Sequence, residues 1–577
     1  MKKAGAILLF LVTGVLLGVS STAHADQRSD QVDKLFSRWN TSSTPGMSVA
    51  IFRNGKQLYT HSYGMANLEL SQPNRATLIY PLGSISKQFA GYCIQLLASE
   101  GKLSLSDDVR RYLPEMHDFG EPITLKMLLT HTSGIRDNVM LLLAKGRNIN
   151  DVTPEQESFD IIVRQTGLNF RPGTRYRYSN ANYVLLAKVV ERVSGMPFAA
   201  FLQQHVFGPL GMSHTSIVGD PVGVMNDRAY GYSGDEHIVP QTSVDSTFGS
   251  TGIYSTIGDL AIWSSQFYEP AEAPRTLPPG VFADMKQPGA LNDGIPITYA
   301  SGLHVESFHR IPYIEHTGEV PGFKADLLVF PKQKLSIVLL ANTDTCDATK
   351  LAFATADIYL KNELPPEPSR PKSVAPPAHA LLEGYAGTYE ILSGTSLIAP
   401  GREVHITLDG NSLRYNDEKL PLLASSDHDF YSQQSQVRIS FLHLKRSSKD
   451  WMVVVHDPSG TDFAGRRVEK VPLPALSVTP LPPDAYAGLY YSTDLDAVYT
   501  VLARGKVLNL LTPRGQVTLI RHSGDFYDVK GNLTEGKVSG MLEFTRTGSN
   551  PNGFLLTVSG ARAANIKFTR ISGAIYP

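Results

Sequence analysis

A short sequence repeat in the last third of the chain constrains its architecture most tightly. Tyr385-Ala386-Gly387-Thr388-Tyr389 returns 101 residues later as Tyr486-Ala487-Gly488-Leu489-Tyr490. Asp429-Phe430-Tyr431 likewise returns 96 residues later as Asp525-Phe526-Tyr527. Because the two offsets nearly agree, we expect two copies of one small domain, with a few residues lost from the second copy.

Each copy of the repeat is rich in short stretches of alternating apolar and polar residues. Examples are Val404-His405-Ile406-Thr407-Leu408, which the turn pair Asp409-Gly410 follows, and Val437-Arg438-Ile439-Ser440-Phe441. Alternation with period two, broken by turn residues at short intervals, is typical of antiparallel sheets. The pattern predicts two small antiparallel β-barrels or sandwiches, over residues 381–471 and 484–577.

Proline-rich segments separate these domains from the rest of the chain and from each other. Leu364 to Pro377 contains six prolines, and a second such stretch runs from Pro472 to Pro483. Segments of this composition are stiff and extended, so we expect a linker at 364–380. The preceding residues, 26–363, are expected to form a first domain, because a chain of 577 residues is too long for a single core.

The first domain mixes strands with helices. The Asn54-Gly55 pair joins two alternating stretches and predicts a β-hairpin. Apolar periodicity predicts helices at Ser84–Ser99 and Ala181–Val193, the second followed by Gly195. Strands at both ends with helices between them predict an α+β fold, in which helices surround an antiparallel sheet and form a second lobe. The expected strands are Met47–Phe52, Gln57–Ser62, Ile311–His316, Ala325–Phe330 and Leu335–Leu340.

The first 25 residues have the pattern of a secretory signal peptide. Lys2 and Lys3 precede an apolar stretch from Ala4 to Val19. The stretch is followed by Ala23-His24-Ala25, which has small residues at the spacing of a cleavage site. A membrane anchor is the alternative, but the stretch is short for a span and is interrupted by glycine. We expect cleavage after Ala25, a periplasmic or secreted protein, and no membrane contact after cleavage.

Charge and cysteine content bear on several classes of function. The formal net charge is −1, so no general electrostatic surface for nucleic acid is expected. The 16 histidines form no HExxH motif, no CxxC motif accompanies them, and we expect neither metal nor cofactor. Cys93 and Cys346 are too few for a disulfide framework; whether they pair stays open, as does the oligomeric state.

Ser84-Ile85-Ser86-Lys87 is a candidate catalytic motif. Three Ser-x-x-Lys sequences occur, but the one at Ser99 contains Gly101 and the one at Ser369 lies among prolines. Only Ser84 opens a predicted helix, where residues three apart share a face, so that Lys87 can reach its hydroxyl. A serine becomes a good nucleophile when a base takes its proton, which Lys87 can do if its pKa is lowered. An N-cap serine beside a solvated lysine is the plainer alternative.

Tyr178-Ser179-Asn180 supplies further groups for the same chemistry. Tyr178 is a second candidate base, since a phenolate beside cations can accept a proton and later pass it to a leaving group. The Asn180 amide can bond both Lys87 and a substrate carbonyl. Asn180 can also be the N-cap of the helix from Ala181, and the two interpretations are compatible.

His316-Thr317-Gly318 is the third motif, on a strand that we place at the edge of the sheet, where it would hold an acyl substrate. Gly318 would let a substrate backbone lie close to this strand. The N–H group of Glu319 would complete an oxyanion hole with that of Ser84. Thr317 and His316 would hold the far end of the substrate and influence Tyr178, although a lone histidine in a strand is more often structural.

These motifs, together with Leu128-Leu129-Thr130-His131-Thr132-Ser133-Gly134 and Gly249-Ser250-Thr251-Gly252-Ile253, resemble those of the serine β-lactamase and penicillin-binding-protein family, class C type. The resemblance covers about Asp26 to Leu360. It implies that Ser84 is the nucleophile, Lys87 the base and Tyr178 the proton relay, with Asn180 and His316 as substrate or network residues. His131 and Thr132 are expected to serve packing and turn geometry.

The chain also departs from this pattern. Its third motif begins with His316, where β-lactamases usually have lysine. In its motifs the chain is similar to soluble DD-carboxypeptidases. In its layout it resembles bacterial D-aminopeptidases, in which a loop from the last barrel reaches the active site and shapes it for a free amino terminus. Supporting stretches are Ser133-Gly134-Ile135-Arg136-Asp137 and Gly488-Leu489-Tyr490-Tyr491-Ser492.

The resemblance therefore implies a secreted serine hydrolase that forms an acyl-enzyme on Ser84. Its expected partners are small peptides with D-residues, of the kind derived from peptidoglycan, or small esters. A carboxypeptidase would use His316 to contact a substrate carboxylate. An esterase or weak β-lactamase is the alternative within this chemistry. A penicillin-binding sensor or scaffold, acylated without turnover, is the alternative of another class.

Overall fold

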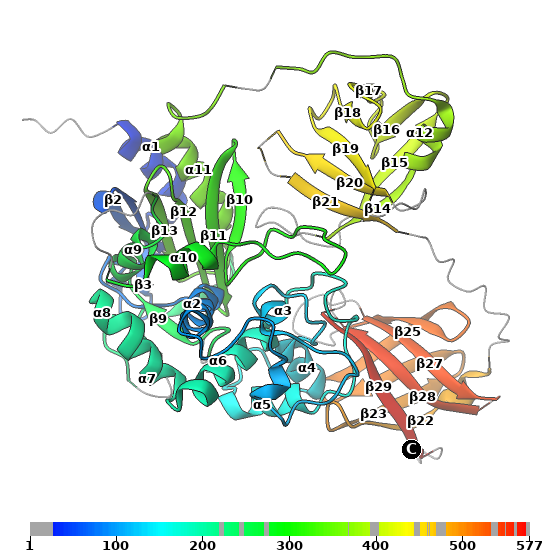
Figure 1. The fold of residues 1–577 in the computed structure, drawn as a ribbon. Coiled ribbons are helices and arrows are strands. Elements are labelled where there is room, and N and C mark those ends of the chain that lie inside the picture. Colours follow the sequence, from blue (N-terminus) through cyan, green and yellow to red (C-terminus); the bar gives the residue numbers. More distant parts are fainter. Residues whose placement is uncertain are drawn as a thin grey trace, which may run out of the picture.

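The computed structural model describes residues 27–572 except 218–223, 242–246, 270–275, 367–368, 393–402, 444–450, 459, 461, 469–480, 532–539, 549 and 559–561. It has an α+β domain followed by two β domains (Figure 1). The predicted signal peptide and most of the second Pro-rich stretch lie outside the described residues. Among the helices described, none is long and apolar enough to cross a membrane.

A six-stranded antiparallel sheet with the order β10-β11-β12-β13-β1-β2 organises the first domain. The first strand pairs with the last, from Met47 opposite Ala341 to Arg53 opposite Leu335, so the two ends of the domain meet in the middle of the sheet. The strands are β1 (Met47–Arg53), β2 (Lys56–Tyr63), β10 (His304–Phe308), β11 (Ile311–Val320), β12 (Phe323–Phe330) and β13 (Leu335–Ala341). All five predicted strands are confirmed.

The predicted hairpin joins β1 to β2. Asn54 and Gly55 both have positive φ, at 52° and 71°. A two-residue hairpin loop with positive φ at both positions is the type I′ turn that Asn-Gly favours, because its twist matches that of the strands.

Helices cover both faces of the sheet. On one face, α1 (Gln27–Phe36) and α11 (Ala348–Leu360) pack with alternate residues of β1 and β13, such as Val49 and Ile337. The residues between them, such as Ala50 and Val338, face the larger core of the second lobe. Its helices are α2 (Ser86–Ser99), α3 (Leu125–Leu129), α4 (Asn138–Lys145), α5 (Glu155–Val163), α6 (Asn180–Ser194), α7 (Phe198–Leu202), α8 (Gly208–Leu210), α9 (Ile257–Ser265) and α10 (Pro279–Met285).

Short elements connect this lobe to the sheet. Those relevant to the site are the 3-10 turn η2 (Gly83–Ile85) and β9, which pairs with both β5 and β6. The short strands are β3 (Met65–Asn67), β4 (Gln72–Pro73), β5 (Tyr80–Pro81), β6 (Ser216–Ile217), β7 (Gly231–Ser233), β8 (Val239–Gln241) and β9 (Ile253–Ser255). The remaining short helical segments are η1 (Ser37–Trp39), η3 (Val109–Arg111) and η4 (Gln203–Phe207).

The two C-terminal domains each have eight antiparallel strands. The first, after α12 (His379–Tyr385), is a sheet that ends at β16 and β17, whereas the second, after η5 (Pro483–Tyr486), is a closed barrel. The first comprises β14 (Gly387–Ile391), β15 (Glu403–Asp409), β16 (Ser412–Tyr415), β17 (Leu423–Ala424), β18 (Asp429–Tyr431), β19 (Arg438–His443), β20 (Trp451–His456) and β21 (Asp462–Arg467). The second comprises β22 (Gly488–Ser492), β23 (Ala497–Arg504), β24 (Val507–Thr512), β25 (Gly515–Ser523), β26 (Phe526–Lys530), β27 (Gly540–Thr547), β28 (Asn550–Val558) and β29 (Ala563–Ser572).

The sequence repeat corresponds to a structural repeat. The Tyr389 hydroxyl donates to the Tyr385 carbonyl at 2.8 Å, and the Tyr490 hydroxyl donates to the Tyr486 carbonyl at 2.7 Å. In both copies an arginine from the last strand, Arg467 on β21 or Arg570 on β29, donates to carbonyls of the same turn. The repeated tyrosines therefore fix the start of each β domain.

The last barrel packs closely against the first domain (Figure 1). Leu141, Leu142 and Ala144 of α4 belong to the same apolar cluster as the interior of the barrel. The Tyr499 hydroxyl on β23 donates to the Ala144 carbonyl in a short, buried hydrogen bond. Since side chains of α4 belong to the apolar cluster of the barrel, the barrel and the helical lobe pack as one interior at this contact.

The first β domain makes a smaller contact. Leu392, Met452 and Ala464 pack into the main core of the first domain. Arg466 on β21 forms an ion pair with Asp293 of the first domain. Arg466 also donates to the Thr174 carbonyl, and Arg175 lies 4.0 Å from Glu390, so these contacts involve the segment before α6.

Candidate active site

Ser84 lies in the 3-10 turn η2, directly before α2. The α-helix itself begins at Ser86, two residues later than the sequence predicts, because Gly83 has a positive φ of 53° and turns the chain tightly there. Lys87 follows in the first turn of α2 and is fully buried. The turn therefore presents the Ser84 hydroxyl while the helix holds Lys87 beneath it.

The Lys87 ammonium donates to three oxygens. Its Nζ atom lies 3.0 Å from Ser84 Oγ, 2.8 Å from Asn180 Oδ1 and 2.9 Å from the Ser250 carbonyl. Three acceptors match the three N–H groups of a lysine. Ser250 belongs to a motif that the sequence singled out without giving it a role, since a backbone carbonyl leaves no signature in residue type.

Tyr178 faces the same serine. The Tyr178 side chain interacts with that of Ser84, and Lys87 Nζ lies 4.9 Å from the centre of the Tyr178 ring. Burial raises the pKa of Tyr178 above its ordinary value, although the bond to Ser84 and the charge of Arg562 act in the opposite direction. At neutral pH the resting side chain is a phenol, not the phenolate that the sequence allowed.

Asn180 bridges Lys87 to a buried carboxylate. Besides accepting from Lys87, its backbone N–H and its Nδ2 donate to Asp137 Oδ2, at 2.8 and 3.1 Å. The predicted N-cap role of Asn180 is wrong: Ser179 occupies the N-cap position of α6, and Asn180 is the first residue of the helix. The side chain is drawn away from its own helix by the two charged groups across the site.

His316 is buried and neutral. Its Nδ1 lies 2.6 Å from the Thr317 carbonyl, and its Nε2 lies 2.8 Å from the Tyr299 hydroxyl. Burial lowers the pKa of His316 well below its ordinary value, with the charge of Lys87 acting in the same direction. Both ring nitrogens thus have partners within the protein, and the ring lies 6.2 Å from that of Tyr178, centre to centre.

Gly318 makes a close contact that the sequence did not predict. A Cβ atom at Gly318 would lie 2.0 Å from the Leu82 carbonyl oxygen, so the glycine admits the turn that carries Ser84. The strand is not an edge strand either, because β10 lies outside β11. However, β10 pairs only as far as Glu315, and a Cβ at Gly83 would lie 2.6 Å from the Glu319 nitrogen. The Glu319 N–H therefore lies beside the turn that carries Ser84, and its predicted part in an oxyanion hole stays a prediction.

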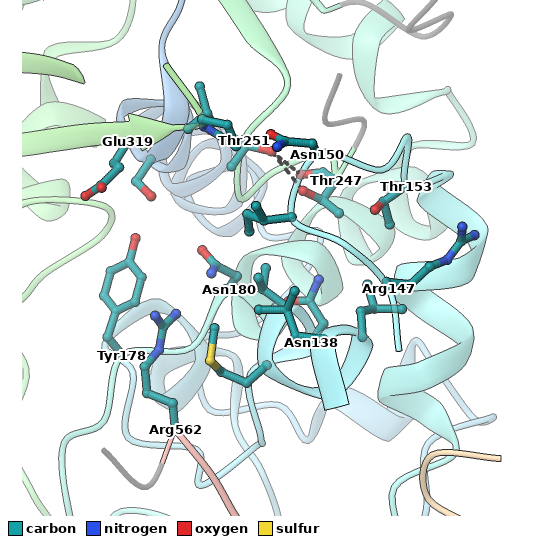
Figure 2. A pocket seen from close by; sticks show the side chains of 18 of the residues that line it. Asn138, Arg147, Asn150, Thr153, Tyr178, Asn180, Thr247, Thr251, Glu319 and Arg562 are labelled. Atoms are coloured by element: carbon teal, nitrogen blue, oxygen red, sulfur yellow. Dashed lines mark hydrogen bonds between the residues drawn. The ribbon is translucent and has the colours of Figure 1, made fainter. Parts of the chain in front are cut away.

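A cavity of about 820 Å³ connects these residues (Figure 2). Ser84, Tyr178, Asn180, His316, Thr317 and Glu319 all line it, so the structure brings the predicted motifs together around one space. Figure 2 shows Tyr178 and Asn180 toward one end and Arg147 and Thr153 toward the other. His131 is buried behind Tyr178 and bonded to Asn182, which fits the packing role predicted for it.

The structure brings two further residues to the site, Asp137 and Arg562, to which sequence reasoning assigned no role there. Arg562 comes from the connection between β28 and β29 of the last barrel and lines the cavity. Its Nη2 donates to Asp137 Oδ2 at 2.6 Å, and its guanidinium lies 5.7 Å from the centre of the Tyr178 ring. Figure 2 shows it reaching up beside Tyr178 and Asn180. A loop of the last barrel thus enters the site; only the resemblance in layout gave a signal for it.

The backbone around Arg562 is anchored to the first domain. The Arg562 carbonyl accepts from the Asp137 N–H at 3.0 Å and from Asn169 Nδ2 at 2.9 Å. Asn169 Oδ1 in turn accepts from the Ala564 N–H at 2.8 Å. Nearby, Arg136 pairs with Asp494 at 2.8 Å, and both side chains are almost fully buried.

Comparison with known proteins places this site in a family. The model of the family described as Beta-lactamase matches residues 32–360, which is more than half of the chain. The chain belongs to the beta-lactamase family. It is a serine hydrolase related to penicillin-binding proteins and D-aminopeptidases.

Curated relatives differ in how much of their length the chain covers. The chain is 25% identical to "Penicillin-binding protein 4*" of Bacillus subtilis, with 70% of this chain and 92% of that protein aligned. It is 26% identical to a D-aminopeptidase of Cereibacter sphaeroides, with 80% and 82% aligned. With a D-aminopeptidase of Brucella anthropi the identity is 27%, over 55% of this chain and 59% of that protein.

A solved structure supports the fold. The octameric penicillin-binding protein homologue from Pyrococcus abyssi aligns with 76% of this chain and 99% of its own, at a TM-score of 0.51 and 22% identity. At that identity the likeness concerns the fold alone.

Proposed function

We propose that this hydrolase works through an acyl-enzyme on Ser84 and acts on peptides that contain D-residues. The contact that carries the proposal is the 3.0 Å separation between Lys87 Nζ and Ser84 Oγ. A serine within hydrogen-bond reach of a buried amine, itself oriented by further acceptors, is the arrangement of an activated nucleophile.

Acylation would proceed from these residues as follows. Lys87 first releases its ammonium proton to solvent. Ser84 Oγ then attacks the substrate carbonyl carbon, and the serine proton passes to the neutral amine of Lys87. The N–H groups of Ser84 and Glu319 stabilise the negative charge on the carbonyl oxygen. Tyr178 donates its proton to the leaving amine nitrogen as the carbon–nitrogen bond breaks. Tyr178 then regains a proton from Lys87.

Deacylation uses the same groups in reverse. A water molecule gives its proton to the Lys87–Tyr178 pair and attacks the ester carbonyl, and Ser84 Oγ leaves with a proton returned to it. A phenol that is protonated at rest suits the donor role, because burial raises the pKa of Tyr178. Asn180 orients the Lys87 side chain by accepting a hydrogen bond from its Nζ atom.

The names of the relatives support a D-residue substrate: two of those described above are D-aminopeptidases. An esterase or weak β-lactamase is the alternative, since the acyl-enzyme needs only a different leaving group. A non-turnover sensor, the alternative of another class, would use the barrels for docking; the packing of α4 into the last barrel favours a role for that barrel in the active site instead. We also propose export, with cleavage after Ala25.

A hydrolysis panel tests the proposal. Purified parent and Ser84→Ala protein are compared on a D-alanine p-nitroanilide, a D-Ala-D-Ala peptide, a p-nitrophenyl ester and a chromogenic cephalosporin. We expect Ser84-dependent release from at least one D-residue substrate at a rate above that for the cephalosporin. Hydrolysis by Ser84→Ala at the parent rate would reject the nucleophile, and activity on the ester alone would reject the substrate class.

A further inference from the structure

The cavity contains a cation that the catalytic steps do not use. Arg562 lines it with a side chain that is 32% exposed. Its backbone is held in place by Asp137 and Asn169, so the guanidinium is presented from a fixed point rather than from a free loop. A positioned guanidinium beside a reactive serine is a potential contact for a substrate anion.

The ion pair with Asp137 leaves part of the guanidinium available. Asp137 Oδ2 accepts from Arg562 Nη2 and also from two N–H groups of Asn180, so its negative charge is shared. Among the described residues no acceptor bonds Arg562 Nη1. A guanidinium has five N–H donors in a planar fork and commonly binds a carboxylate through two of them.

The other charged groups favour an anion at this end of the cavity. Lys87 and Arg562 bring two basic groups to the neighbourhood of Tyr178. Of the two carboxylates that act on this phenol, Asp137 is paired with Arg562 and Glu315 does not line the cavity. Glu319 also lines the cavity, but its carboxylate pairs with Lys324 at 2.5 Å and is 70% exposed. A substrate ammonium placed beside Arg562 would meet a like charge.

His316, the predicted carboxylate contact, is poorly suited to that task. Both of its ring nitrogens are bonded within the protein, and it is neutral. The cation that could hold a substrate carboxylate therefore comes from the last barrel rather than from the third motif.

We propose that Arg562 is a specificity residue that binds a carboxylate on the leaving-group side of the scissile bond. The inference rests on the proposed function and narrows it to the release of a C-terminal residue. This proposal differs from what the resemblance to D-aminopeptidases implies, namely that a loop of the last barrel shapes the site for the free amino terminus of a substrate.

The position of Tyr178 connects the charge to the leaving group. The Tyr178 side chain interacts with that of Ser84, and the Arg562 guanidinium lies 5.7 Å from the centre of the same ring. In a peptide the carboxylate of the departing residue lies about 4 Å from the scissile carbonyl carbon, one peptide unit away. A leaving amine that takes a proton from Tyr178 thus brings its own carboxylate toward Arg562.

The test compares two substrates that differ only in this charge, N-acetyl-D-Ala-D-Ala and its C-terminal carboxamide. We expect the parent to prefer the free carboxylate by roughly 10- to 100-fold in kcat/KM, the effect of a hydrogen bond to a charged group. Arg562→Gln should reduce this preference to within about twofold, because the side chain keeps polar contacts but loses its charge. Arg521→Gln, on an exposed arginine of the same barrel, should keep the parent preference.

A second variant separates charge from positioning. Asp137→Asn weakens the support of Asn180 without removing the arginine, so it should slow both substrates while the carboxylate preference persists. Loss of the preference in Asp137→Asn to the same degree as in Arg562→Gln would overturn the proposal, as would an unchanged preference in Arg562→Gln. Hydrolysis of neither peptide by a parent whose Ser84 is labelled by a fluorophosphonate would also overturn it. The Ser84→Ala variant distinguishes failure of the proposed function from failure of the Arg562 proposal. If Ser84→Ala retains hydrolysis, the proposed nucleophile itself is wrong.

Discussion

The Asp137 carboxylate and the Arg562 guanidinium form a 2.6 Å ion pair although 425 residues separate them. Asp137 also caps α4 by accepting from the Met140 N–H, and it supports Asn180 beside Lys87. A single buried carboxylate therefore joins the last barrel, a helix of the first domain and, through Asn180, Lys87. The barrel contributes Arg562 to the lining of the cavity that Ser84 also lines.

The first prediction concerns the buried ion pair between the two domains. Arg136 and Asp494 are 2% and 3% exposed, so removing one partner leaves an uncompensated charge in the interface. We expect Asp494→Ala to lower the free energy of unfolding by about 3–5 kcal/mol. Urea denaturation, followed by intrinsic fluorescence, measures the change.

A surface pair in the same interface is the control. Arg164 and Asp496 lie 3.3 Å apart with side chains 38% and 55% exposed. Asp496→Ala should cost about 0–1 kcal/mol. Equal losses in the two variants would show that burial does not determine the strength of this interface.

The second prediction tests Tyr178 as the proton donor. Tyr178→Phe keeps the ring over Lys87 and removes only the hydroxyl, so we expect kcat to fall by about 10²–10⁴-fold with thermal stability little changed. Tyr176→Phe, two residues earlier and also lining the cavity, should change kcat by less than about threefold. A Tyr178→Phe enzyme as fast as the parent would leave Lys87 as the sole proton carrier.

The third prediction concerns the close approach of β11 to the serine turn. A Cβ at residue 318 would lie 2.0 Å from the Leu82 oxygen, so Gly318→Ala must displace the turn that carries Ser84. We expect the rate of Ser84 labelling by a fluorophosphonate to fall by about 10²-fold, the usual effect of a displacement near 1 Å. Gly280→Ala meets no atom within 4 Å and should label at the parent rate. Normal labelling of Gly318→Ala would show that the turn tolerates the shift.

The fourth prediction is a pH dependence of stability. Burial lowers the pKa of His316 below its model-peptide value of 6.5. Below about pH 6.5 the unfolded chain binds a proton at this residue that the folded chain excludes, so acidification destabilises the fold by at most about 1.4 kcal/mol per pH unit for this group. Above that pH the contribution is constant.

Unfolding at pH 7.5 and pH 5.5 measures this effect. The parent should lose more stability between the two pH values than His316→Gln, whereas His522→Gln, on an exposed side chain, should match the parent. The same pH dependence in parent and His316→Gln would mean that His316 titrates normally in the folded protein.

The regular parts of the fold are predictable because local patterns specify them. The Asn54-Gly55 turn, the period-two stretches and the Tyr385 and Tyr486 landmarks all encode their own conformation over a few residues. The helix before Gly195 is likewise fixed by its apolar face and by a glycine with positive φ at its C-terminus. In these places propensity and tertiary packing favour the same structure.

The sequence prediction fails where a distant segment decides the outcome. Asn180 is a suitable N-cap by residue type, but Lys87 and Asp137 offer its amide stronger, charged partners. The close contact of Gly318 with the Leu82 carbonyl also depends on a distant segment, so no local pattern could reveal it. Arg562 carries no local signal at all, because its role depends on how the barrel docks on α4.

The most direct test of the central claim is mass spectrometry of the acylated protein. The parent is incubated briefly with a slowly hydrolysed acylating ester, quenched in acid and digested, and the Ser84→Ala variant is treated in parallel. The account predicts one added acyl group in the parent, on the peptide that contains Ser84, and none in the variant. An acyl group on another residue, or an equal yield in Ser84→Ala, would contradict it.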